Sequence, residues 1–455
     1  MQDFSAVAPR AAAALQEWYA ADSYARKTGL YSYSDPSLEV DWKDWSSLSQ
    51  VRSNFLNSLI ALSGRRHPRE VMAHWWNSAN ALTAVIGYMA ATGDRSYLPV
   101  VENTFARAAG AYRPINAQLS LARPFTLNLA SYQGFINGFY DDEGWWALAW
   151  LGAYDLTGDE KYLTCAEGVF TDMAGAWDDI WSGGIHWGKH AGQPDRAGMT
   201  AVPRGWQGPY KNAIANELFI AVASALALRF RDLKQSGKDH DDYAQWALRG
   251  WEWLSASSPR GVALINEANL VNDSPNSHGV NDNTKGVWSY NQGVILSGLC
   301  DLTELSGDQD YLECAEKIAT AFVANPWQVE HASGKQAKRI LPAVQSGVID
   351  GILHEHNDCN PDGSALRQGG ATPGAGSAQF KGIFVRNLAR LYLKTRNPIF
   401  AEFIHTNARS AVSNMNEHYQ FGCNWAAAAD APDFLRQTAG LDLLNAALVV
   451  SASGR

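Results

Sequence analysis

Two adjacent aspartates, Asp141 and Asp142, are the residues with the clearest potential for chemistry. They lie in the segment GFYDDEGWW, residues 138–146, where a helical pattern begins. One aspartate at a helix start is an ordinary cap, but a pair beside two tryptophans exceeds what capping needs. Two carboxyl groups can cleave a glycosidic bond when one is ionised and the other carries a proton. Repulsion between neighbouring carboxylates raises the pKa of one of them, which helps it to keep its proton. The sequence therefore predicts a carbohydrate-cleaving pair here.

Tryptophans and amides recur at the starts of other predicted helices. The segments are HWWN at 74–77, WSGGIHW at 181–187, WQGPYKN at 206–212 and WSYNQG at 288–293. Indole rings offer an apolar face to a sugar, and amide side chains can bond to its hydroxyl groups. Each segment alone is more often structural, but a helical barrel would bring helix starts to one rim. The candidate substrate contacts are Trp145, Trp76, Asn77, Trp181, Tyr210, Asn212, Tyr290 and Gln292.

Helical periodicity dominates the elements that must position these residues. Alternating strand patterns are scarce, and the periodic segments are rich in Ala and Leu, which favour helices. The sequence therefore predicts an all-α fold. The predicted helices cover 79–92, 143–157, 214–233, 292–306 and 380–394. Long connections occupy 181–210, 255–286 and 326–379, and loops of that length are more often functional or disordered than idle.

A short repeat indicates how the helices are connected. TGDRSYL at 92–98 returns as TGDEKYL at 157–163 and as SGDQDYL at 306–312, with a worn copy at 395–400. Glycine can end one helix in the left-handed conformation, and aspartate can cap the next. The spacing suits helical hairpins of about 65–75 residues. We expect six hairpins in a single (α/α)6-barrel catalytic domain over 1–455, with an open solenoid of hairpins as the alternative.

Composition narrows the class of protein. The formal net charge is −9 and the chain holds 18 tryptophans. An acidic chain lacks the basic patches of a nucleic-acid binder, and no run of about 18 apolar residues predicts a membrane span.

His354, Glu355 and His356 could hold a metal, yet such spacing is common in loops. A two-carboxylate hydrolase needs neither a metal nor another cofactor, so we expect none.

Cysteines and chain ends say less about the protein. The five cysteines are widely spaced and predict no disulfide framework, although a bridge between Cys359 and Cys423 stays open. The N-terminal residues lack a basic segment followed by an apolar one. We therefore expect either a cytoplasmic protein or a mature chain whose signal has been removed.

Several motifs together resemble glycoside hydrolase family 76, the α-1,6-mannanases and their fungal cell-wall relatives. The resemblance runs across most of the chain and is far more specific than the aspartate pair alone. It is carried by HWWNSANALTAV (74–85), YDDEGWWALAWLGAYDLTGD (140–159), WSGGIHW (181–187), YKNAIANELF (210–219), WSYNQGVILSG (288–298) and FKGIFVRNLARL (380–391).

The resemblance implies an (α/α)6 barrel and endo-hydrolysis of α-1,6-mannosidic bonds with retention of configuration. It gives Asp141 the role of nucleophile and Asp142 that of general acid/base. It also implies that Asp273 binds a sugar, with Asp282 as a rival because this loop is longer and richer in Asn than is usual. We expect a monomer that acts on α-mannan or manno-oligosaccharides. The alternatives are a cell-wall transglycosidase, a non-catalytic glycan-binding barrel and another (α/α)6 enzyme.

Overall fold

The computed structural model describes twelve α-helices, two β-hairpins and the loops that adjoin them. The ranges described are 4–20, 29–31, 68–109, 115–120, 123–129, 134–189, 209–233, 240–255, 261–281, 286–325, 346–355, 376–429 and 432–453.

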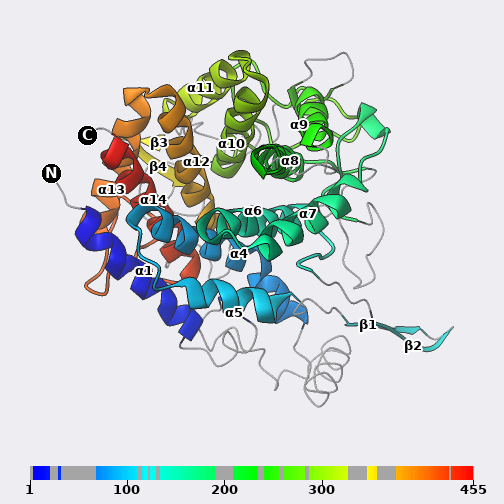
Figure 1. The fold of residues 1–455 in the computed structure, drawn as a ribbon, viewed down its shortest axis with the longest axis horizontal. Coiled ribbons are helices and arrows are strands. Elements are labelled where there is room, and N and C mark those ends of the chain that lie inside the picture. Colours follow the sequence, from blue (N-terminus) through cyan, green and yellow to red (C-terminus); the bar gives the residue numbers. More distant parts are fainter. Residues whose placement is uncertain are drawn as a thin grey trace, which may run out of the picture.

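Six helices form a closed inner ring (Figure 1). Each of these helices contacts the next member of the ring, and the last member also contacts the first. This closure excludes the open solenoid and confirms the predicted (α/α)6 barrel. All five predicted helices lie within members of the ring. The ring consists of α4 (Pro68–Thr92), α6 (Tyr140–Thr157), α8 (Ala213–Leu233), α10 (Ser289–Ser306), α12 (Phe380–Thr395) and α14 (Phe434–Ser453).

The other six helices surround this ring. Helix α7 packs on α6, α9 on α8, α11 on α10, and both α13 and α1 on α14. Among the described helices, only α8 is long and apolar enough to cross a membrane, and nearly all of its residues are buried inside the barrel. The outer helices are α1 (Phe4–Ala20), α5 (Leu98–Ala108), α7 (Glu160–Ala174), α9 (His240–Ser255), α11 (Asp310–Val323) and α13 (Pro398–Asn414).

The repeated motif forms the corner between an inner and an outer helix, as predicted. Gly93, Gly158 and Gly307 have φ values of 79°, 73° and 77°. After each glycine, the aspartate side chain accepts a hydrogen bond from a backbone amide two residues ahead, at 2.8–3.1 Å. The worn copy has the same shape, because Arg396 is left-handed and the Asn397 side chain caps α13.

The strands form two short antiparallel hairpins that the sequence patterns did not predict. β1 (Ile115–Ser120) pairs with β2 (Arg123–Leu129) and extends away from the helices in Figure 1. β3 (Ser346–Ile349) pairs with β4 (Ile352–Glu355). Two 3-10 turns, η2 (Ile180–Ser182) and η3 (Gly376–Gln379), complete the described elements. Cys165, Cys300 and Cys314 are free thiols. Cys359 lies outside the described residues, so the bridge between Cys359 and Cys423 that the sequence leaves open stays untested.

The inner helices approach one another closely where a glycine faces a neighbouring backbone. A Cβ atom at Gly293 of α10 would lie 2.7 Å from the Cα atom of Phe384 in α12. Gly382 of α12 faces the Cα atom of Ala439 in α14 in the same way. These contacts draw the ring together near the end where the helices begin.

Gly293→Ala should therefore destabilise the barrel by about 1–3 kcal/mol. The added methyl group would meet backbone atoms of α12, which cannot move aside as a flexible side chain could. Thermal unfolding followed by circular dichroism measures the effect. Gly168→Ala is the matched control, since Gly168 is exposed on α7 with no atom within 4 Å of the added methyl group. It should stabilise the protein by about 0.4–1 kcal/mol. Equal effects of the two changes would contradict the close-approach argument.

Candidate functional site: an acidic and aromatic cleft

A cleft of about 450 Å³ lies at the end of the barrel where the inner helices begin. First turns of α6, α8, α10 and α12 contribute to it, as the shared position of the motifs predicts. Trp76 comes from α4 and Trp145 from the second turn of α6, and the connections before α8, α10 and α12 contribute the rest. The lining residues are Trp76, Asp141, Asp142, Trp145, Trp187, Tyr210, Asn212, Ile214, Asp273, Trp288, Tyr290, Ser377 and Phe380.

Asp141 lies in the first turn of α6 and is held by a tryptophan. The indole Nε1 of Trp187 donates a hydrogen bond to Asp141 Oδ2 at 2.9 Å, while Oδ1 has no partner among the described residues. Burial raises the pKa of Asp141 to about 6, and the charge of Asp273 adds to the rise. The Trp187 bond and the backbone amide of Asp142 act against it, because both stabilise the ionised form.

Asp142 has the higher proton affinity of the two. Burial raises its pKa well above the ordinary value, and the negative charge of Asp141 raises it further. The side-chain amide of Asn137 donates to Asp142 Oδ2 at 2.6 Å and opposes the shift. The Trp187 bond thus favours the ionised form of Asp141, and the charge of Asp141 favours the protonated form of Asp142. That division of protons is the one that two-carboxylate hydrolysis requires.

Glu143, the third acid of the segment, has a structural role. Its side chain is fully buried, and Oε1 lies 2.7 Å from the ammonium group of Lys189. The same oxygen accepts the backbone amide of Asn137 at 2.9 Å. Because Asn137 also bonds to Asp142, Glu143 fixes the segment that holds the cleft acid.

Asp273 supplies a third carboxylate to the cleft. The hydroxyl of Tyr210 donates to Asp273 Oδ2 at 3.3 Å. The backbone carbonyl of Asp273 accepts the amide of Ala213 at 2.7 Å, which ties its loop to the start of α8. The rival residue Asp282 lies outside the described residues, as does Trp206.

Aromatic rings form a continuous wall of the cleft. Trp76 stacks on Trp145 at 6.4 Å between centroids and also meets Phe380 at 6.2 Å. Phe380 in turn contacts Tyr290 at 3.9 Å and Trp288 at 5.5 Å. Such a surface suits the apolar faces of sugar rings.

A partly buried arginine contacts the wall from the barrel interior. The guanidinium carbon of Arg386 lies 5.8 Å from the ring centroid of Trp145. One nitrogen of this group donates to Asn80 Oδ1 at 2.7 Å, and another lies 3.3 Å from Asp442 Oδ2. Burial raises the pKa of Asp442 to about 6, against the attraction of Arg386.

Three predicted contacts do not line the cleft. Asn77 donates to the Gln379 side chain at 2.8 Å, and Gln292 bonds to both the amide and the carbonyl of Val271 at 2.8 Å. Trp181 packs against Gly279 so closely that no side chain would fit there. Amide and indole groups at helix starts satisfy loop backbones and pack loops together, and here those roles prevail over exposure to the cleft.

Five lining residues were absent from the predicted contacts. Trp187 and Trp288 belong to motifs that we singled out, and Phe380 begins the FKGIF motif. Phe380 and Ile214 lie in the first turns of inner helices, and that position alone could have marked them as cleft residues. Ser377 lies in η3 and carries no such signal.

Of the segment 354–356, which we considered as a metal site but did not predict to be one, the structure describes His354 and Glu355. Glu355 is fully buried and accepts hydrogen bonds from the hydroxyls of Ser289 and Ser346. It therefore fixes the first turn of α10, next to Tyr290. Burial lowers the pKa of His354 to about 3, and His356 lies outside the described residues. No group of three or more metal-binding side chains occurs in the part of the chain that the structure describes.

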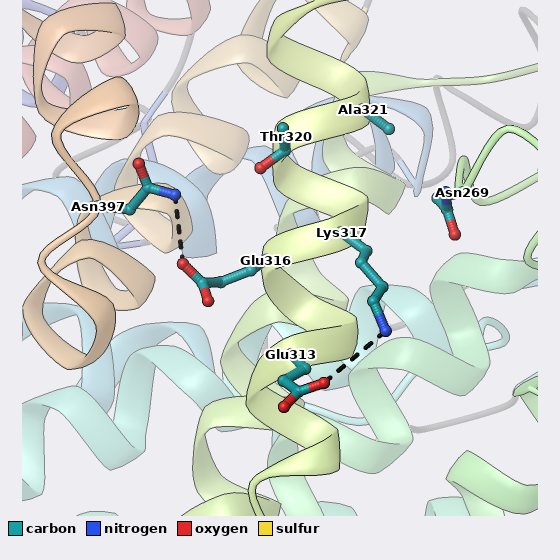
Figure 2. Close-up of a pocket in the computed structure, with 7 residues that line it drawn as sticks. All are labelled: Asn269, Glu313, Glu316, Lys317, Thr320, Ala321 and Asn397. Carbon is teal, nitrogen blue, oxygen red and sulfur yellow. Dashed lines mark hydrogen bonds and ion pairs between the residues drawn. The ribbon is translucent and has the colours of Figure 1, made fainter.

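A second hollow lies on the outer face of α11 (Figure 2). Its carboxylates already have partners, because Glu313 lies 3.9 Å from Lys317 and Glu316 accepts from Asn397 at 3.3 Å. It is lined by Asn269, Glu313, Glu316, Lys317, Thr320, Ala321 and Asn397, with no aromatic ring among them. The acidic cleft is therefore the better candidate for chemistry on a sugar.

A helical barrel with paired carboxyl groups in an aromatic cleft defines a glycosidase. Residues 56–454 match the family model described as glycosyl hydrolase family 76. The chain belongs to that family.

Curated relatives at low identity carry related names. Mannan endo-1,6-alpha-mannosidase DCW1 of Candida albicans is 24% identical over 258 residues, 54% of this chain and 48% of the relative. The chain thus spans about half the length of that relative. The protein of the same name from Saccharomyces cerevisiae is 23% identical over 422 residues, 86% of this chain and 76% of the relative.

Solved structures share the fold. The GH76A α-1,6-mannanase of Salegentibacter sp. HEL1_6 is 20% identical with a TM-score of 0.64, and the match covers 98% of this chain and all of that one. Dfg5 of Chaetomium thermophilum, solved with glucosamine, is 21% identical with a TM-score of 0.58, and the match covers 82% and 80%.

Asp142→Asn should make the folded protein more stable at pH 7. A carboxyl group whose pKa is raised by folding contributes its full stability below the unfolded pKa of about 4. That contribution is lost as the pH rises toward the folded pKa, and the neutral amide avoids the loss. We expect the melting temperature to rise by about 1–3 °C at pH 7, with the gain vanishing near pH 4.

Asp159→Asn is the contrasting control. Its carboxylate caps α7, and hydrogen bonds to Lys161 lower its pKa. This change should not raise the melting temperature at pH 7. Equal gains from both variants would show that the cleft does not disfavour charge at Asp142.

Proposed function

We propose that the protein is an endo-acting hydrolase that cleaves α-1,6-mannosidic bonds in α-mannan with retention of configuration. The observation that carries this proposal is the pair of adjacent carboxyl groups, Asp141 and Asp142, that line an aromatic cleft in a chain of glycosyl hydrolase family 76. The names of the relatives support mannan as the substrate. In addition, an inactive variant of the Salegentibacter enzyme, with two adjacent aspartates changed to asparagine, was solved in complex with α-1,6-mannotriose.

The proposed reaction uses each carboxyl group twice. Ionised Asp141 attacks the anomeric carbon and forms a glycosyl ester while Asp142 donates its proton to the departing glycosidic oxygen. Asp142, now ionised, removes a proton from water, which attacks the same carbon and breaks the ester. Two displacements restore the original configuration. Ionised Asp141 and protonated Asp142 are then ready for another cycle.

The remaining lining residues bind the mannan chain in this proposal. Trp76 and Trp145 stack on sugar rings, together with Tyr290. The Asp273 carboxylate and the Asn212 amide accept or donate hydrogen bonds to sugar hydroxyls, and Tyr210 orients Asp273.

Asp141→Asn and Asp142→Asn should each lower the release of oligosaccharides from linear α-1,6-mannan by about 1,000-fold or more, because one displacement loses its nucleophile or its acid. Asp155→Asn is the matched control. Asp155 is on the same helix but is exposed and paired with Arg229, so its loss should leave the rate unchanged. Full activity in either cleft variant would refute the assignment.

Product analysis separates the mechanisms. Proton NMR should detect the α-anomer first if configuration is retained, whereas an initial β-anomer would contradict retention. Transfer of mannosyl units to an added acceptor, in excess of hydrolysis, would instead favour a cell-wall transglycosidase. Binding without turnover would favour a glycan-binding barrel.

Asp273→Asn should shift the acid side of the pH–activity profile to lower pH. The rate on this side rises as Asp141 ionises, and the charge of Asp273 raises the pKa of Asp141. Removing that charge makes Asp141 easier to ionise, so activity should persist to a lower pH, by about half a pH unit. The measurement is kcat/KM against pH on mannan. A shift in the opposite direction would show that Asp273 does not act on Asp141 through its charge.

A further inference from the structure

The loop that carries Trp187 has an unusual backbone. Four consecutive residues have positive φ: Trp181 at 55°, Ser182 at 64°, Gly183 at 137° and Gly184 at 78°. Left-handed conformations are costly for residues other than glycine and persist only where the surroundings impose them. A Cβ atom at Gly183 or Gly184 would collide with the rings of Trp177 or Trp253. The conformation of this loop therefore depends on strong contacts from outside it.

Lys211 supplies these contacts from a fully buried position. Its ammonium nitrogen lies 2.6 Å from Asp178 Oδ1 and 2.7 Å from the carbonyl oxygen of Gly183. The carbonyl oxygens of Ile180 and Gly184 are both at 2.9 Å. Four oxygens around one ammonium group, three of them main-chain carbonyls, resemble the oxygen coordination of a bound cation. Burial lowers the pKa of Lys211, and the charges of Asp178 and Asp179 oppose this.

The same residues lead to Trp187. The second oxygen of Asp178 lies 2.8 Å from His186 Nε2, directly before Trp187 in the chain. The backbone amide of Trp187 donates to the carbonyl of Tyr210 at 3.0 Å, and Tyr210 directly precedes Lys211. Lys211 thus connects the loop 178–184 to the segment 210–211, and Trp187 is attached to both. These attachments direct the Trp187 indole at Asp141.

We propose that Lys211 is a positioning residue whose ammonium group serves as a built-in cation for the loop 178–184 and thereby maintains the hydrogen bond from Trp187 to Asp141. The kinetic part of this inference rests on the proposed function, while the structural part concerns only the Trp187–Asp141 contact. Lys211 does not line the cleft itself. Its effect on the reaction is transmitted through an indole N–H group.

Several other charged or titratable groups face Asp141, and the variants used in the tests below must leave these residues unchanged. They are Asp142 on the same helix, Tyr210 and Asp273 from the loops, and Tyr290 from α10. Lys211 faces a different set, namely Asp178, Asp179 and His186. Because the two sets do not overlap, Lys211 has no charged neighbour in common with Asp141, and a change at Lys211 should reach Asp141 through the backbone segments that carry Trp187 and Tyr210.

The first test follows the indole N–H signal of Trp187 by NMR across pH, without any substrate. The signal is assigned as the one missing from Trp187→Phe. In the wild type it should titrate with Asp141, near pH 6. In Lys211→Met the midpoint should rise by about half a pH unit or more, because a weaker hydrogen bond stabilises the carboxylate less. An unchanged midpoint would overturn the proposal.

Lys381→Met is the matched control for the loss of a buried lysine. Lys381 is also buried, and its ammonium group bonds to the carbonyl of Cys423 at 2.6 Å and lies over the ring of Trp425. Its loss should lower the melting temperature without moving the Trp187 titration. The same shift in both variants would show a general loosening of the barrel and count against the proposal.

A double-mutant cycle on mannan gives the second test. Trp187→Phe should move the acid side of the kcat/KM profile upward by about one pH unit, since the ionised nucleophile loses its donor. Lys211→Met should move it in the same direction, and the double variant no further than Trp187→Phe alone. Additive shifts would mean that Lys211 acts on Asp141 by another route.

Asp178→Asn keeps the proposal testable if Lys211→Met does not fold. It retains an oxygen for Lys211 but removes the charge, and its side chain is partly exposed. We expect a smaller upward shift of the Trp187 titration, whereas no shift would contradict the proposal. If wild-type protein shows the NMR titration but does not cleave mannan, the proposed function fails while the positioning role stands.

Discussion

Burial and mutual repulsion disfavour charge on both of two neighbouring carboxyl groups, and the site is organised around that constraint. Asp141 receives the stabilising donors, an indole N–H and a backbone amide, whereas Asp142 receives one amide and the field of its neighbour. The asymmetry therefore comes from what surrounds each group, since the two residues are chemically identical. Glu143, Lys189 and Asn137 fix the segment before the helix, so the difference between the aspartates is built into the backbone.

The barrel supplies this asymmetry because it gathers segments that are distant in sequence. The aspartates come from α6, their indole partner from the connection before α8, and Asp273 from the connection before α10. Closure of the inner ring brings these connections to one rim. Arg386, Asn80 and Asp442 meet below the aromatic wall and hold Trp145 from the interior. These polar contacts fix Trp145 beneath the more exposed rings of the wall.

Much of this arrangement is predictable from the sequence, for physical reasons. The TGD corners combine a left-handed glycine with a capping aspartate, both local effects, and so they revealed the hairpins and the ring. The cleft residues in first turns of inner helices followed from that geometry. Trp181, Asn77 and Gln292 had equally suitable types and positions, but their orientation depends on loop packing that no local pattern encodes. The contacts of Lys211 could not be predicted from the sequence for the same reason. Three of its four oxygen partners are main-chain carbonyls, which approach one point only because the loop 178–184 has an unusual backbone.

Ring closure has a consequence for how the chain reaches its native state. The side chain of Asn445 in α14 donates to the carbonyl of Ala84 in α4 at 2.9 Å, across 361 residues of sequence. Contacts of such long range form late and slow folding. During synthesis, α4 and α6 emerge long before α14 exists, with Trp75, Trp146 and Trp150 on surfaces that end up buried. The nascent protein thus passes through a stage with a large unsealed aromatic face, when it is most prone to aggregate and most dependent on chaperones.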